Sequence, residues 1–181
     1  MNSATIRTLT VTALKAAATD AGDRVYSPRD WPTRSADYPA LLVQTPFDHK
    51  HSMGRNAPQF TSVTTVRITG RVEAFDTEDA EIGAMLAEEA CEQLRLQVEQ
   101  GVINSYELTR STQQYKEVRS TIDVDSSGES HIGQLLFEID VEYFQGPEDF
   151  FPIATNTLEG IDLRIKEPDG TTVPGFNADL T

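Results

Sequence analysis

The stretch QLLFEIDVEYF, residues 134–144, decides the fold, because apolar and acidic side chains alternate along most of its length. The apolar set is Leu135, Phe137, Ile139, Val141 and Tyr143. The acidic set between them is Glu138, Asp140 and Glu142. Successive side chains of a β-strand point to opposite faces, so the pattern predicts a strand with one buried face and one face in water.

Three other stretches predict the strands that pair with it. Residues 59–74 alternate Val, Ile and Ala with Arg, Thr and Glu, and residues 117–125 alternate in the same way. A turn at residues 126–130, which contains Gly128, predicts a hairpin between 117–125 and 134–144. Residues 40–44 are mostly apolar and predict a buried strand. We therefore expect an antiparallel or mixed sheet of four strands.

Two stretches have helical periodicity. Residues 3–19 repeat Ala and Leu at helical spacing, with Asn2 or Ser3 as N-cap, and end near Gly22. Apolar side chains recur every four residues from Ile82 in the second stretch, for which Asp76 is the expected N-cap and Gly101 the expected stop near residue 100. Residues 102–114 fit no single pattern and leave a short extra strand open. Together these elements predict an α+β fold with two helices packed on one face of the sheet.

The chain divides by pattern into a domain at residues 1–145 and a C-terminal extension at residues 146–181. The extension is rich in Pro until Ile161, Leu163 and Ile165 alternate with polar residues before a turn at residues 168–170. So few apolar residues cannot form a core of their own. The extension is therefore expected to form a small hairpin or arm that docks on something or stays mobile.

Charge and apolar content exclude several classes of function. The 181 residues include 29 acidic and 15 basic side chains, a net charge of −14, which disfavours tight binding to nucleic-acid phosphates. The sequence has no apolar run of membrane-helix length and no signal-peptide pattern at its start, so we expect a protein made and kept in solution, without a membrane. Its one cysteine, Cys91, lies among apolar helix positions and is expected to be buried and inert.

Motifs for catalysis or metal binding are weak. Residues 123–128, with Asp123 and Asp125, match the start of a calcium-binding loop, but Gln134 stands where the loop needs its last carboxylate. His49 and His51 are two imidazoles without a third ligand nearby. The sequence has none of the common nucleophile, phosphate-loop or zinc motifs. We expect no cofactor and no enzymatic activity, with a metal-assisted hydrolase as the least favoured alternative.

Two sets of residues are candidate interaction sites. The aperiodic stretch from Thr45 to Pro58 predicts a long exposed loop, and long loops often carry function. Its locally basic members are His49, Lys50, His51 and Arg55. Such a basic region suits an acidic partner surface, including that of another copy. The acidic strip formed by Glu138, Asp140 and Glu142 predicts a row of like charge facing water or a lumen.

The element order, together with four phrases, resembles a known family over residues 3–145. The phrases are TLTVTALKAA (8–17), YPALLVQTP (38–46), TTVRITGRVEA (64–74) and HIGQLLFEIDVEY (131–143). They resemble the tail terminator proteins of long-tailed bacteriophages, which are similar to the lambda tail terminator. The resemblance implies a structural virion protein that forms a ring, generally of six copies, at the head-proximal end of the tail tube. There it stops tube polymerisation and provides a surface for head–tail joining.

The resemblance also implies partners and a location. The partners would be the protein itself, the tail tube protein and the head–tail connector or neck proteins, with DNA only passing through the channel. The location would be the tail or neck of the virion, and the host cytoplasm during assembly. Carried over, Thr45–Pro58 would be a contact loop, and the acidic strip would be a candidate channel wall whose charge keeps DNA sliding. Small members of the family lack residues 146–181, which leaves a neck or tail-completion protein and a free-standing binding domain as alternatives.

Overall fold

The computed structural model describes residues 1–27, 34–55, 58–77, 82–127, 130–151 and 160–179. The chain forms two compact units, Met1–Phe150 and Phe151–Thr181. We describe each unit by itself.

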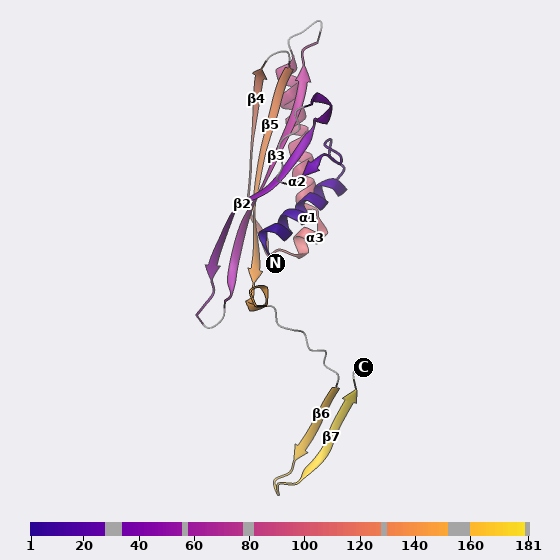
Figure 1. Ribbon diagram of the computed structural model, residues 1–181, viewed down its shortest axis with the longest axis vertical. Coiled ribbons are helices and arrows are strands. Elements are labelled where there is room, and N and C mark those ends of the chain that lie inside the picture. Colours follow the sequence, from indigo (N-terminus) through magenta and orange to yellow (C-terminus); the bar gives the residue numbers. More distant parts are fainter. Residues whose placement is uncertain (28–33, 56–57, 78–81, 128–129, 152–159, 180–181) are drawn as a thin grey trace. The chain divides into compact units, whose positions relative to one another are not determined.

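The first unit is built on a mixed five-stranded sheet with the order β1-β2-β3-β5-β4 (Figure 1). Its strands are β1 Val25–Tyr26, β2 Ala40–Ser52, β3 Phe60–Phe75, β4 Gln114–Ser127 and β5 Ser130–Gln145. Neighbouring strands are antiparallel except β1 and β2, which are parallel. The α+β class is confirmed, but the sheet has five strands rather than four. The added strand, β1, is too short for alternation to show in its sequence.

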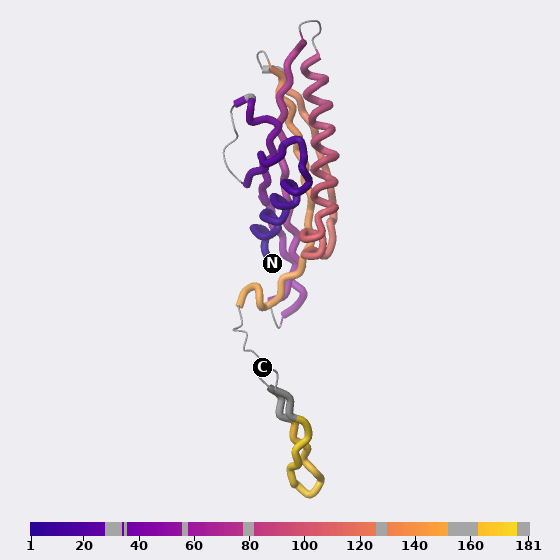
Figure 2. The backbone as a smooth tube through the Cα atoms, turned by 90° about the vertical axis from the view of Figure 1, so that its right-hand side faces the viewer, coloured from indigo at the N-terminus to yellow at the C-terminus, as the bar shows by residue number. Residues whose placement is uncertain are grey.

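The helices α1 Ser3–Ala16 and α2 Gly83–Ile103 lie on one face of this sheet (Figures 1 and 2). Helix α2 packs on β3, β4 and β5, while α1 packs mainly on β2 and on α2. Asn2 is the N-cap of α1, as predicted, because its side chain accepts a hydrogen bond of 2.9 Å from the amide of Thr5. The opposite face of the sheet, called the open face below, carries no helix among the described residues.

Two predicted details of the helices are wrong. Helix α2 begins at Gly83 instead of Asp76, although the Asp76 carboxylate still accepts a hydrogen bond of 2.8 Å from the Gly83 amide. Gly101 does not end α2, which continues to Ile103. The glycine instead allows the close approach of the C-terminal end of α1, since a Cβ at residue 101 would lie 2.8 Å from the Cβ of Ala17. Residues 102–114, where the sequence left a short extra strand open, contain the short helix α3 Tyr106–Arg110, capped by Ser105.

The core lies between the helices and the inward face of the sheet. The apolar positions that alternate in β5 are all buried, as are Ile68 of β3 and Leu94 of α2. Cys91 is also fully buried, facing Gly133, where a Cβ would lie only 2.7 Å from the sulfur. The predicted placement of Cys91 in the core is therefore confirmed.

The predicted loop Thr45–Pro58 is mostly strand, which corrects the sequence prediction. Strand β2 continues to Ser52 and pairs with β3 from Phe60, with an irregularity between Gln44 and Phe47. We call residues 47–52 and 60–65 the arm; its lower end lies beyond the helices (Figure 1). Periodicity could not reveal it, because every residue from Pro46 to Ser52 is exposed and no buried face imposes alternation. Pro46 is tolerated because it stands at the irregularity of a strand edge.

The second unit contains the antiparallel hairpin of β6 Gly160–Lys166 and β7 Thr172–Asp179. In its turn the amide of Glu167 donates to the carbonyl of Thr171 at 2.8 Å, and the Asp169 carboxylate accepts from the Thr171 amide at 2.9 Å. Gly170 has φ +90°, a conformation that glycine adopts at little cost.

Candidate functional site

The open face of the sheet holds a ladder of ion pairs centred on Glu138. Arg67 of β3 and Arg119 of β4 are its direct cross-strand neighbours, and each places its Nε 2.8 Å from a different Glu138 oxygen. Arg119 also reaches Asp140 at 3.3 Å and Glu117 at 3.4 Å. Burial alone would raise the pKa of Glu138, but hydrogen bonds from Arg67 and Arg119 outweigh it and lower that pKa.

The remaining members of the acidic strip have partners too. Asp140 accepts a hydrogen bond of 2.6 Å from Thr65. Glu142 accepts one of 2.8 Å from Gln114 and lies 3.1 Å from the ammonium of Lys116, and these two contacts lower its pKa. The three carboxylates share one face, as the alternation predicts. Each has a cationic partner, so the strip carries less unopposed negative charge than its sequence indicates.

The structure separates the four basic residues that the sequence grouped together. His49 and His51 lie on the open face of the arm, since they pair with Val63 and Thr61. Lys50 lies on the other face, 3.2 Å from the Asp48 carboxylate and hydrogen-bonded to Gln145. Arg55 is exposed in the bend beyond β2. Phe47, which the sequence analysis passed over, is 61% exposed on the open face, with the Arg67 guanidinium 5.8 Å from its ring centre.

A polar cluster holds the inward face of the arm, and it has two centres. At the first, the Asp48 carboxylate accepts hydrogen bonds from Thr64 at 2.6 Å and from Tyr143 at 3.2 Å. Burial would raise the pKa of Asp48, but the Thr64 and Lys50 contacts outweigh it and lower that pKa. Burial raises the pKa of Tyr143, so its hydroxyl keeps its proton.

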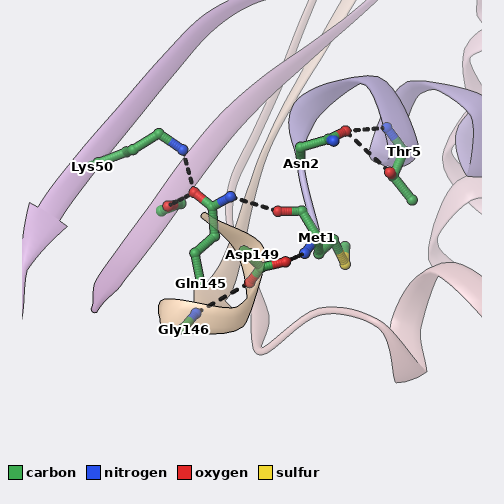
Figure 3. A network of polar contacts seen from close by, with 8 residues as sticks. Met1, Asn2, Thr5, Lys50, Gln145, Gly146 and Asp149 are labelled. Atoms are coloured by element: carbon green, nitrogen blue, oxygen red, sulfur yellow. Dashed lines mark hydrogen bonds and ion pairs between the residues drawn. The ribbon is translucent and has the colours of Figure 1, made fainter. Parts of the chain in front are cut away.

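The second centre is the amide of Gln145 (Figure 3). Its oxygen accepts hydrogen bonds from Lys50 and, at 2.8 Å, from Ser62, and its nitrogen donates to the Met1 carbonyl at 2.6 Å. Asp149 pairs with the Met1 ammonium and accepts from the Gly146 amide at 3.1 Å. Ser62 and Thr64 occupy inward positions of β3, where an apolar residue is the norm. That break in the alternation is the signal that could have revealed the cluster from sequence.

A groove of about 600 Å³ lies between α1, α2 and α3. Its walls include small or apolar side chains, Leu9, Ala13 and Ala16 of α1, Ala17 directly after it and Gly101 of α2, and polar ones, among them Gln97, Gln100, Asn104 and Glu107. Tyr106 of α3 also lines the groove and is 73% exposed. The groove belongs wholly to the first unit.

The candidate metal ligands do not converge. His49 and His51 lie in the arm on β2, while Asp123 and Asp125 lie on β4, at the opposite edge of the sheet. Gly128 falls outside the described residues. Within the described part of the chain, no group of three or more His, Cys, Asp or Glu residues could hold a metal ion.

The Asp76–His131 pair and the Cys91 thiol lie outside the open face and the arm. His131 Nε2 lies 3.4 Å from the Asp76 carboxylate, which also receives the first amide of α2. The Gly83 hydrogen bond, followed by the His131 contact, lowers the pKa of Asp76. Burial raises the pKa of the Cys91 thiol to about 11, and the charges of Glu92 and Glu88 act in the same direction. A thiol with that pKa is a poor nucleophile at neutral pH.

Comparison with protein-family models finds no match. Comparison with curated proteins also finds no match. Within the described residues, no helix is both long and apolar enough to span a bilayer.

Proposed function

We propose that this protein is a structural virion protein that forms a ring at the head-proximal end of a phage tail tube. It would stop tube polymerisation there and offer the surface for head–tail joining. Another neck or tail-completion protein is a close alternative, because it would use the same kinds of surface. A free-standing binding domain is the more distant one.

The arm is the observation that carries this proposal. Strands β2 and β3 extend past the helices, and the open face of the arm presents Phe47, His49 and His51 to solvent. Its inward face is fastened by the hydrogen bonds of Asp48 and Gln145. An exposed arm held in one conformation has already lost the entropy that a flexible loop would lose on binding. It therefore suits a repeated contact between subunits.

The open face supports a structural role as well. The acidic strip on this face is matched within the sheet, because its three carboxylates pair with Arg67, Arg119 and Lys116. A face with matched charges can lie against a neighbouring copy without placing like charges opposite each other. Head-to-tail contacts between different surfaces of identical subunits generate a ring when the rotation from one subunit to the next closes.

The free-standing binding domain has less support. That hypothesis needs Lys50 and Arg55 to grip an acidic partner, but Lys50 is engaged by Asp48 and Gln145 on the inward face. Reversing the charge of Arg55 alone should then leave partner binding in place under the ring proposal. Loss of all partner binding with tail assembly intact would favour the binding domain instead.

The test combines the solution mass with electron microscopy of the protein, with and without tail tubes. The proposal expects a closed ring in solution or on one end of each tube, and tubes of fixed length in its presence. Phe47→Ser should weaken ring formation. Phe75→Ser is the matched control, because Phe75 is 51% exposed on the same strand system but lies outside the arm. A monomer that ignores tubes would refute the proposal.

A further inference from the structure

The hairpin of the second unit presents an apolar face to solvent. Leu163 pairs directly with Phe176 and Ile165 with Val173, so the four side chains share one face. Their exposed fractions are 52%, 62%, 52% and 36% in that order. An isolated two-stranded hairpin is marginally stable in water. A surface that covers this face would stabilise it.

The groove of the first unit has complementary features. The alanines and the glycine in its walls leave a hollow between polar residues of the helices, whereas the hairpin offers large exposed apolar side chains. The groove is mainly apolar, and burial of apolar surface is the main favourable term in association. Each copy of the chain therefore carries one projecting apolar face and one apolar hollow.

We propose that the apolar face of the β6–β7 hairpin docks in the α1–α2–α3 groove of a second copy of this chain. This inference rests on the proposed ring and adds a specific contact between its subunits. A patch and a hollow on different parts of one molecule give head-to-tail association, which generates a ring when the rotation closes. Every subunit of the ring would make the same two contacts, because its hairpin docks on one neighbour and its groove holds the hairpin of the other.

The size of the contact favours a second copy over a freely diffusing partner. Stable complexes use about 20 to 30 residues on each side, whereas the described apolar face of the hairpin has four large side chains. Such a contact is too small to hold two free proteins together. Residues 151–159 can span at most about 30 Å, so a neighbour already held in the ring would meet the hairpin at millimolar effective concentration. The hairpin contact then stabilises an assembly that forms through other surfaces.

Chemical crosslinking between two variants, each with one added cysteine, tests the docking. Thr12→Cys places a thiol in the groove, and Glu167→Cys places one at the turn end of the hairpin, two residues after Ile165 on the apolar face; the native Cys91 is buried. Full-length variants are mixed in the presence of tail tubes and treated with a short bismaleimide. We expect a crosslinked dimer in the mixture and at least fivefold less of it when each variant is treated alone.

Two further substitutions separate docking from chance contact. Phe176→Ser in the hairpin and Ala16→Glu in the groove should each lower the dimer yield at least fivefold. Lys166→Ser is the control, since it changes the opposite face of the same hairpin and should leave the yield unchanged. Ala16 is exposed, so its substitution tests the groove without disturbing the core.

The outcomes distinguish this inference from the proposed function. Rings in the micrographs without crosslinked dimer would overturn the docking and leave the ring proposal standing. Crosslinks within an assembly that is not a closed ring would support the docking and refute the ring. A double variant, Thr12→Cys with Glu167→Cys, that crosslinks only within one chain would also overturn the inference, because the hairpin would then cover its own groove.

Discussion

The centre of the ion-pair ladder allows a quantitative prediction through Glu138→Gln. The side chain of Glu138 is only 13% exposed and accepts one hydrogen bond of 2.8 Å from each of Arg67 and Arg119. A hydrogen bond to a charged group contributes about 1.5–3 kcal/mol, and a neutral one about 1 kcal/mol. Glutamine keeps an acceptor but loses the charge. After discounting for the solvent that reaches the arginines, we expect a loss of about 1–2 kcal/mol in the free energy of unfolding.

Glu117→Gln is the matched control, because Glu117 meets the same Arg119 at 3.4 Å with its side chain 62% exposed. An exposed pair of this kind contributes roughly 0–1 kcal/mol, so the control should stay near the native value. Urea unfolding followed by circular dichroism at pH 7 measures both variants. With a slope of about 2 kcal/mol per M, Glu138→Gln should lower the midpoint by about 0.5–1 M. Equal midpoints for the two variants would refute the reasoning that burial makes the ladder stabilising.

The sign of the pH dependence follows from the same contacts. The pKa of Glu138 is lower in the folded chain than in the unfolded one. Its contribution is therefore fully present above the ordinary glutamate pKa and is lost as the pH falls through the lowered folded value. The stability difference between the native protein and Glu138→Gln should accordingly shrink as the pH is lowered below 4.5. A difference that grows in acid would contradict this assignment.

Three other expectations follow from the structure. Gly101→Val should lower the melting temperature, with about 1–3 kcal/mol lost to overpacking against Ala17, whereas Gly54→Val, at an open position, should change it little. Tyr143→Phe should cost about 1 kcal/mol and speed amide hydrogen exchange in the arm, because the hydrogen bonds of the Tyr143 hydroxyl to Asp48 and Thr64 are lost. Cys91 should react with a thiol reagent at pH 8 only at the rate of global unfolding, and fast labelling under native conditions would show that its burial and raised pKa are misassigned.

Alternation predicted those strands that have one buried and one wet face. Strand β3 follows from it to within one residue at each end, and β5 to within one residue at its C-terminal end although β5 begins four residues before the predicted start. Helix α2 covers one face of each strand and solvent reaches the other. The arm escaped prediction for the opposite reason. From Pro46 to Ser52 both faces of β2 are exposed, so the pairing with β3 determines its conformation and no pattern of burial records it.

The sequence predicted which face of the sheet the candidate site residues occupy, but it did not predict their hydrogen-bond and ion-pair partners. The shared face of Glu138, Asp140 and Glu142 follows from their spacing of two. Their pairing with Arg67 and Arg119 depends on the register of β3 and β4 against β5, which involves residues far apart in the sequence. Lys50 shows the same limit, since the hydrogen bond to Gln145 that engages it crosses the sheet.

The distribution of charge bears on which surface could face passing DNA in the proposed ring. On the open face the carboxylates of the strip are matched by cations. On the outer side of α2, Glu88, Glu89 and Glu92 are exposed, and among the described residues only Glu92 has an ion-pair partner, Arg95 at 2.6 Å. Repulsion of a phosphate backbone depends on charge that is not already neutralised nearby. The outer side of α2 therefore meets the requirement for a channel wall better than the acidic strip does. Lysine substitutions at Glu88 and Glu89 should slow DNA passage through assembled particles more than Glu138→Gln does.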